Sequence, residues 1–176
     1  LESIAEEACH IEMQVLKEPV GKQDQYIAAF GGFRVLEIDT HGKVNVSAVH
    51  VDSSVAHELA VKARMYYTGV QRSATAVLKA QDTAARDHKS QDHARVVDSL
   101  LQIKDIGREI QKAFEAKDLD AFGKLMDDHW AHKKRMSASI SLSSLDELYD
   151  TVKKEFGVLG GKIIGAGGGG FLMLYC

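Results

Sequence analysis

The pattern of apolar residues at the start of the chain predicts a helix, a loop and a hairpin. Apolar side chains recur at intervals of three and four, as on one face of an amphipathic helix, at Leu1, Ile4, Ala8, Ile11 and Val15. We expect this helix to end near Lys17, ahead of the only proline in the chain, Pro19. A loop with a short helix or turn should follow over residues 18–32, and apolar runs on either side of DTHG predict a hairpin over residues 33–51.

Helical periodicity predominates in the rest of the chain, after one more predicted strand. Residues 59–67 alternate between apolar and polar side chains, which is typical of a half-buried strand. Four helical segments follow, over residues 71–88, 93–115, 118–133 and 143–156, and short apolar runs predict two closing strands, over residues 161–164 and 171–175. The candidate caps of the last helix are Ser143 and Ser144. Its predicted apolar face consists of Leu145, Leu148, Val152 and Phe156. This order of elements predicts an α+β fold with a boundary near residues 51–57.

The segment KIIGAGGGGFLMLYC, residues 162–176, places five glycines in six positions. Its spacing satisfies G-x-G-x-x-G through Gly165, Gly167 and Gly170, so a dinucleotide-binding site is the first hypothesis. That fingerprint needs a helix after the glycines, whereas FLMLYC is short, aromatic and aliphatic and predicts a strand. We therefore expect a strand, a glycine loop and a second strand, and a helix over residues 171–176 would restore the dinucleotide hypothesis.

Composition narrows the class of protein. The 176 residues are 45% hydrophobic and 27% charged, which is ordinary for a globular protein. A net charge of −3 and a pI near 6.2 argue against a nucleic-acid surface. The sequence has no 18-residue apolar run and no signal-peptide pattern, so we expect a cytoplasmic protein without a membrane partner. Cys9 and Cys176 are expected to be small hydrophobic residues in a reducing compartment.

The segment GKQDQYIAAFGG carries a carboxylate, Asp24, in a glycine-bracketed loop. Such an Asp can act as a general base, with a nearby cation such as Lys22 keeping it ionised. Glu12 lies beside the predicted apolar face of the first helix, from which it could reach this loop and ligate Mg²⁺. The alternative is that Asp24 forms a turn and that Glu12 has a buried stem and a solvated head.

Two basic segments are candidates for a second anion site. In TGVQRSA, Arg72 and Ser73 lie at the start of a predicted helix, where free N–H groups favour an anion. In HWAHKKRMS, Lys133 and Lys134 end another helix. The alternative is a solvated basic turn that complements the helix dipole. His129 and His132 share one helix face without a third ligand nearby, which favours structural or surface roles.

Together these segments, GKQDQYIAAFGG, TGVQRSA, HWAHKKRMS and GGKIIGAGGGGFLML, resemble the GHMP kinases, a family that includes galactokinase, homoserine kinase and mevalonate kinase. The resemblance implies the end of a ribosomal-S5-like N-terminal domain over residues 1–55, and a ferredoxin-like C-terminal domain with extra helices over residues 56–176. It implies transfer of the ATP γ-phosphoryl to a sugar hydroxyl, with a heptose 7-phosphate as the acceptor. The sequence leaves the oligomeric state open, a homodimer included.

The resemblance also implies roles for individual residues. Asp24, with Lys22, would accept or orient the hydroxyl proton, and Glu12 would hold Mg²⁺. Gln25 would contact the substrate. The glycine loop would fold against the active site, where side chains would obstruct substrate and phosphates, and the glycines concerned are Gly165, Gly167, Gly168, Gly169 and Gly170.

Two family motifs, the first motif and the phosphate-binding loop, are not found in these residues. The phosphate-binding loop of the type P-x-G-L-G-S-S-A would precede Leu1, so we expect the 176 residues alone to bind ATP poorly and to be inactive. Two other functions remain open. One is a GHMP kinase of the galactokinase or fucokinase type, and the other is a non-catalytic folding or substrate-binding module.

Overall fold

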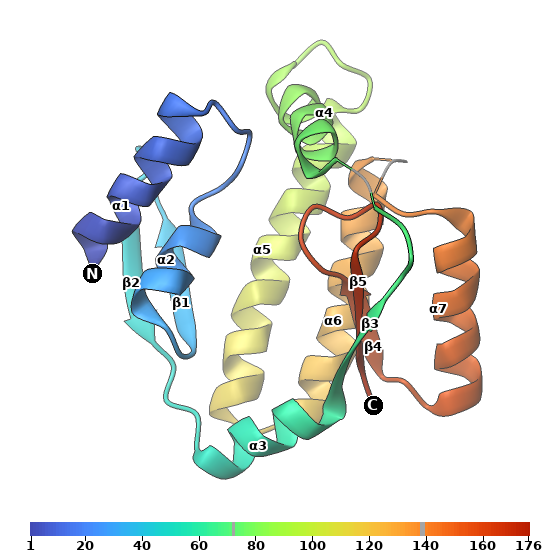
Figure 1. The fold of residues 1–176 in the computed structure, drawn as a ribbon. Coiled ribbons are helices and arrows are strands. Elements are labelled where there is room, and N and C mark those ends of the chain that lie inside the picture. The colour runs from blue at the N-terminus through green and yellow to red at the C-terminus, as the bar shows by residue number, and fades with distance from the viewer. Residues whose placement is uncertain (72, 138–139) are drawn as a thin grey trace. The chain divides into compact units, whose positions relative to one another are not determined.

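The chain separates into two compact units, Leu1–Val51 and Asp52–Cys176. The structure is a computed structural model that describes residues 1–71, 73–137 and 140–176 (Figure 1). Each unit has its own cluster of buried side chains, so the two are described in turn. Both combine helices with antiparallel strands, which confirms the α+β class.

The first unit contains the helix, short helix and hairpin that the sequence predicts. Helix α1, Glu2–His10, continues as a π-helical turn, η1, Ile11–Val15. After a loop, α2 spans Gln23–Phe30 and leads into the antiparallel strands β1, Arg34–Ile38, and β2, Val44–Ala48. The predicted end of the first helix near residue 17 is confirmed.

The apolar face predicted for the first helix is wrong. Its large aliphatic side chains are exposed: Leu1, Ile4, Ile11 and Val15. The buried positions are instead Ala5 and Cys9, which join Tyr26 of α2 and Val44 of β2 in the core of this unit. Small side chains at these two positions let α1 lie close to α2, and burial raises the pKa of the Cys9 thiol.

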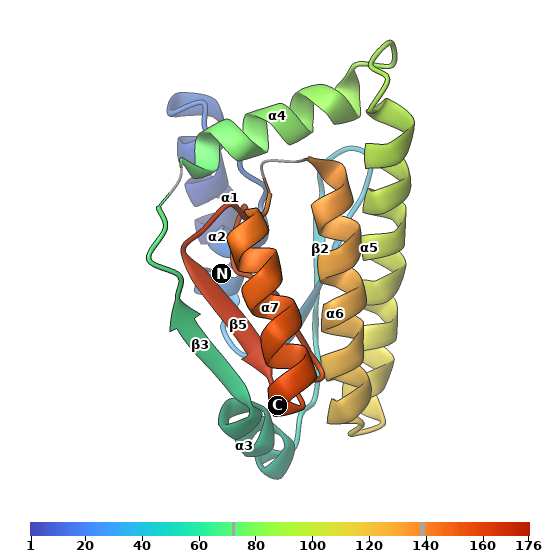
Figure 2. The same ribbon diagram turned by 90° about the vertical axis from the view of Figure 1, so that its right-hand side faces the viewer.

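The second unit is built on a three-stranded antiparallel sheet in the order β3-β5-β4 (Figures 1 and 2). Strand β3 spans Ala63–Tyr67, β4 spans Gly160–Ile163 and β5 spans Phe171–Tyr175. Both closing strands are thus confirmed. Because a strand, not a helix, follows the glycines, the dinucleotide-binding hypothesis is excluded.

Five helices complete this unit: α3, Ser53–Lys62; α4, Ala74–Arg86; α5, His93–Glu115; α6, Leu119–Met136; and α7, Ser143–Phe156. Helices α5 and α6 run side by side, and the C-terminal end of α4 lies near the N-terminal end of α5 (Figure 2). Among the helices that the structure describes, none combines the length and apolar character needed to cross a bilayer.

Three local predictions in this unit are wrong. Residues 59–62 belong to helix α3, because helical spacing from Val55 outweighs the alternation, and Val55 is the buried side chain of that helix. In α7, Tyr149 is buried while Leu148 and Phe156 are exposed, so the buried face is rotated from the one expected. Ser143 and Ser144 are also not caps, since they are the first helical residues and no side chain caps α7.

Helix α6 and strand β4 approach each other at two glycines. A Cβ placed on Gly160 would lie 2.0 Å from the carbonyl oxygen of Gly123 and 2.8 Å from the backbone N of Asp127. A Cβ on Gly123 would lie 2.5 Å from the Tyr175 ring. The backbones of α6 and β4 are therefore in direct contact, which no larger residue at these positions would allow.

Because of this backbone contact, one added methyl group at Gly160 should strongly destabilise the fold. We expect Gly160→Ala to lower the free energy of unfolding by about 3 kcal/mol or more, because the new Cβ meets helix backbone that cannot move aside. Urea denaturation followed by circular dichroism measures the change.

Gly107→Ala is the matched control, since Gly107 lies in α5 with no heavy atom within 4 Å of an added Cβ. It should raise the free energy of unfolding by about 0.5–1 kcal/mol, the gain expected for alanine over glycine in a helix. Equal effects of the two substitutions would contradict the backbone contact.

Candidate functional site

The first candidate site lies at the start of α2, where Lys22 ties three segments of the first unit together. Its ammonium donates hydrogen bonds to both carboxylate oxygens of Glu6, at 2.7 and 2.9 Å, and to the carbonyl of Gly42, at 2.8 Å. Tyr26 donates to Glu6 as well, at 2.5 Å. The hydrogen bonds from Lys22 and Tyr26 hold the pKa of Glu6 below its ordinary value. All three Lys22 donors are therefore used within this unit.

Glu12 and Gln25 form the second contact of this site. The Gln25 side-chain amide donates to Glu12 Oε2 at 2.6 Å. Gln25 is 8% exposed, and its own oxygen has no hydrogen-bond partner among the described residues. Glu12 lies in the π-helical turn η1, and such turns occur often at functional sites. The structure thus brings Glu12 to the residue next to Asp24.

Asp24 itself is exposed in the first turn of α2. A carboxylate at this end of a helix is favoured by the helix dipole. Within the described part of the chain, no hydrogen bond or ion pair engages the Asp24 side chain, so it is available to a ligand.

The residues around Glu12 could supply only part of the ligands of a Mg²⁺ ion. One oxygen of Glu12 accepts from Gln25, which leaves Oε1 without a protein partner in the residues described. In the same residues no three His, Cys, Asp or Glu side chains gather as a metal site. A single carboxylate suits Mg²⁺ when phosphates and waters supply the other ligands.

The second candidate site is the glycine loop between β4 and β5. All five glycines have positive φ angles, from 76° at Gly165 to 146° at Gly169. A Cβ on Gly167 would lie 2.8 Å from the Ile140 carbonyl oxygen, and one on Gly169 would lie 2.6 Å from that of Val70. These two glycines are needed because the loop packs against the chain's own backbone.

Hydrogen bonds hold the same loop in place. The N–H of Gly168 donates to the carbonyl of Ile140 at 2.6 Å, and the N–H of Gly170 donates to that of Val70 at 2.8 Å. Gly165 is different, because a Cβ there would meet nothing within 4 Å, and its carbonyl accepts a hydrogen bond from Lys133.

The predicted basic residues have different surroundings. Lys134 forms an ion pair with Asp146 at 2.9 Å, so its charge is balanced within the unit. Lys133 has no carboxylate partner among the described residues, and burial, with repulsion from Lys162, lowers its pKa to about 8. Ser73 caps α4 by accepting from the N–H of Ala76 at 3.4 Å. Arg72 lies outside the described residues.

Sequence reasoning missed Glu6 and Lys162, and it gave His129 only a structural or surface role. Burial, with the charges of Lys162 and Lys133, lowers the pKa of His129 to about 3. Its Nδ1 is shielded from solvent without a partner in the described residues. The position of Lys162 three residues before the glycine loop was the available signal for it, whereas nothing in the sequence marks Glu6.

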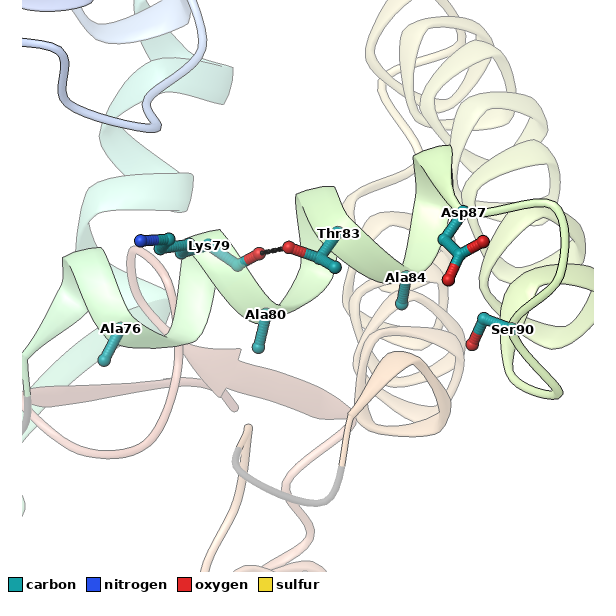
Figure 3. A pocket seen from close by; sticks show the side chains of 7 residues that line it. All are labelled: Ala76, Lys79, Ala80, Thr83, Ala84, Asp87 and Ser90. Atoms are coloured by element: carbon teal, nitrogen blue, oxygen red, sulfur yellow. Dashed lines mark hydrogen bonds between the residues drawn. The ribbon is translucent and has the colours of Figure 1, made fainter.

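A groove in the second unit lies away from both candidate sites. It has a volume of about 490 Å³ and follows one face of α4 from Ala76 to Asp87, with Ser90 at the end near Asp87 (Figure 3). It contains none of the predicted site residues. Three of its seven lining residues are alanines, and Thr83 donates a hydrogen bond to the carbonyl of Lys79. It therefore adds no chemistry to either site.

The second unit is characterised by an antiparallel sheet whose strands β4 and β5 are connected by the glycine loop. Residues 110–176 match the family model described as GHMP kinases C terminal. Over these residues the chain is therefore similar to the C-terminal domain of GHMP kinases.

Two curated relatives extend the match beyond this domain. The D-glycero-alpha-D-manno-heptose 7-phosphate kinase of Campylobacter jejuni is 28% identical over 172 residues, which cover 98% of this chain and 49% of the relative. The L-fucokinase/L-fucose-1-P guanylyltransferase of Bacteroides fragilis is 27% identical over 164 residues, which cover 92% of this chain and 16% of the relative. The chain thus spans about half the length of the first relative and less of the second.

Solved structures agree in fold. A putative sugar kinase from Campylobacter jejuni is 26% identical, with a TM-score of 0.61 over 97% of this chain and 46% of that one. Mevalonate kinase of L. major, in complex with R-mevalonate, has a TM-score of 0.65 at 19% identity over 88% of this chain and 43% of that one. Galactokinase of Lactococcus lactis, with galactose, has the same score and identity over 94% and 49%.

The half-buried, uncharged state of His129 predicts how the stability of the fold depends on pH. The folded state keeps His129 unprotonated down to about pH 3, whereas the unfolded chain binds a proton near the ordinary value of 6.5. Stability is therefore lost as the pH falls below about 6.5. We expect His129→Gln to reduce the loss in unfolding free energy between pH 7 and pH 5 by up to about 2 kcal/mol.

Urea denaturation at the two pH values measures this difference. His57→Gln is the control, because His57 is exposed on α3 of the same unit. If the wild type and His129→Gln lose the same stability on acidification, His129 is not held uncharged.

Proposed function

We propose that the full-length protein containing this chain is an ATP-dependent sugar kinase whose acceptor is D-glycero-D-manno-heptose 7-phosphate. The observation that carries the proposal is the alignment with a kinase of that name over 98% of this chain, which includes both the Asp24 segment and the glycine loop. The exposed carboxylate of Asp24, the adjacent Glu12–Gln25 pair and the basic side chains beside the glycine loop are compatible with this chemistry.

In this proposal the first unit handles the reacting hydroxyl. Asp24 accepts the proton of the sugar hydroxyl as its oxygen bonds to the γ-phosphorus, while the bond from that phosphorus to the ADP oxygen breaks. Lys22 serves by fixing the first turn of α2 through Glu6 and the Gly42 carbonyl. Gln25 contacts the substrate through its unpaired oxygen.

Glu12 is the proposed Mg²⁺ ligand, through the oxygen that Gln25 leaves unpaired. When bound, Mg²⁺ neutralises the charge of the ATP phosphates. In the second unit, the loop from Gly165 to Gly170 would approach the phosphorylated ligands, and Arg72, Ser73, Lys133 and Lys134 would favour an acceptor that already carries a phosphate.

A fucokinase-type activity is the second candidate, because the fucokinase of Bacteroides fragilis aligns with 92% of this chain. An assay of ADP release by the full-length gene product, with ATP, Mg²⁺ and each sugar in turn, separates the two. We expect turnover with D-glycero-D-manno-heptose 7-phosphate and none with L-fucose or galactose. Turnover with an unphosphorylated sugar alone would overturn the acceptor, and no turnover with any of them would leave a non-catalytic module.

Asp24→Asn tests the proposed base. The substitution keeps the size of the side chain and removes its charge and basicity, so we expect kcat of the full-length protein to fall by about 10²–10⁴ while the protein folds normally. Steady-state kinetics measures kcat, and circular dichroism measures folding.

Glu37→Gln provides the matched loss of a carboxylate, since Glu37 is exposed on β1 of the same unit. It should leave kcat unchanged. A near-normal kcat in Asp24→Asn would remove Asp24 from the chemistry.

A further inference from the structure

Three basic side chains meet where the second half of α6 runs along β4. Gly160 lies beside Gly123 and Asp127, and the carbonyl of Gly165 accepts from Lys133 further along α6. Strand β4 and the following loop therefore run in the same direction as α6. This arrangement brings Lys162 of β4 close to His129 and Lys133, which is why the charge of Lys162 acts on both.

The charges of Lys133 and Lys162 have no counter-charge among the residues that the structure describes. Within the described residues, no carboxylate lies at ion-pair distance from Lys133 or Lys162, although both side chains are half-buried. The neighbouring lysines are paired, Lys134 with Asp146 at 2.9 Å and Lys153 with Asp127 at 2.5 Å. Cations that are partly removed from water without a partner are unfavourable, and burial lowers the pKa of Lys162 as well as that of Lys133.

The hydrogen-bonding capacity of the cluster is also largely unused. Lys133 donates to one carbonyl, that of Gly165, which leaves two of its three donors. The side chain of Lys162 has no hydrogen bond in the described part of the chain, although its backbone pairs with β5. His129 adds a neutral imidazole whose Nδ1 has no partner there. Unpaired donors with excess positive charge are the chemistry that recognises an oxyanion.

We propose that His129, Lys133 and Lys162 form a binding site for the phosphate group of a phosphorylated ligand. The inference deepens the proposed kinase function and rests on it for the identity of the ligand, since a sugar phosphate and ATP both carry this group. The lysines supply the charge, and the glycine loop, held by its hydrogen bonds to Ile140 and Val70, fixes one wall beside Lys133.

The site is tested first with inorganic phosphate and the 176-residue chain. Phosphate is titrated at pH 7 and constant ionic strength, and backbone amide shifts are followed by NMR. We expect saturable shifts at His129 and over residues 162–170. Lys133→Met and Lys162→Met keep an apolar stem without the charge, and each should weaken the dissociation constant at least about tenfold.

Two further variants serve as controls, one for the loss of a lysine elsewhere on α6 and one for a change of side chain that keeps the charge. Lys124→Met is the control, because Lys124 is exposed on the same helix, and its affinity should equal that of the wild type. Lys162→Arg keeps the charge and should stay within about threefold of the wild type, which separates loss of charge from loss of folding. Absence of saturable shifts, or equal affinity in Lys162→Met and Lys124→Met, would overturn the site.

Competition then identifies the ligand. We expect D-glycero-D-manno-heptose 7-phosphate to displace phosphate, and the same heptose without its phosphate to leave it bound. Displacement by ATP alone would overturn the assignment to the sugar phosphate. Phosphate binding by the chain without kinase activity of the full-length protein would refute the proposed function and leave the anion site standing.

Discussion

The backbone contact between α6 and β4 is the constraint on which the second unit depends. Gly123 and Gly160 let the helix lie directly on the strand, with no side chain between them. Because of this contact, the strand and the glycine loop follow the helix, and Lys162 lies near His129 and Lys133. Two residues without side chains therefore determine where the charged side chains meet.

Near the contact between α6 and β4, some lysines are paired with carboxylates and others are not. The chain has 25 acidic and 22 basic residues, so carboxylates are not scarce. Asp127 and Asp146 pair with Lys153 and Lys134, whereas Lys133 and Lys162 have no such partner in the described residues. Since Lys134 and Lys153 are paired nearby, the unpaired charge of Lys133 and Lys162 is a local property of the cluster and not a consequence of composition.

The order of helices and strands could be predicted because it depends on local periodicity. The helix boundaries near residues 93, 115 and 156 and both closing strands were confirmed. The buried face of each helix was harder to predict, since it depends on which element packs against the helix. Ala5 and Cys9 are buried in place of Ile4 and Ile11 because small side chains suit the close contact of α1 with α2. Residues 59–62 fit both periods, and burial of Val55 favours the helix.

The sequence by itself identified the two segments that carry the candidate chemistry, GKQDQ and GGKIIGAGGGG. Both could be recognised because a purely structural loop seldom needs such a combination of residue types. The sequence also determined that the glycines lie between two strands, since short apolar runs flank them. Only the tertiary structure decided which polar groups meet. Glu6 with Lys22, Glu12 with Gln25, and Lys162 with Lys133 are 16, 13 and 29 residues apart. Such contacts depend on packing between elements, and no local pattern encodes them.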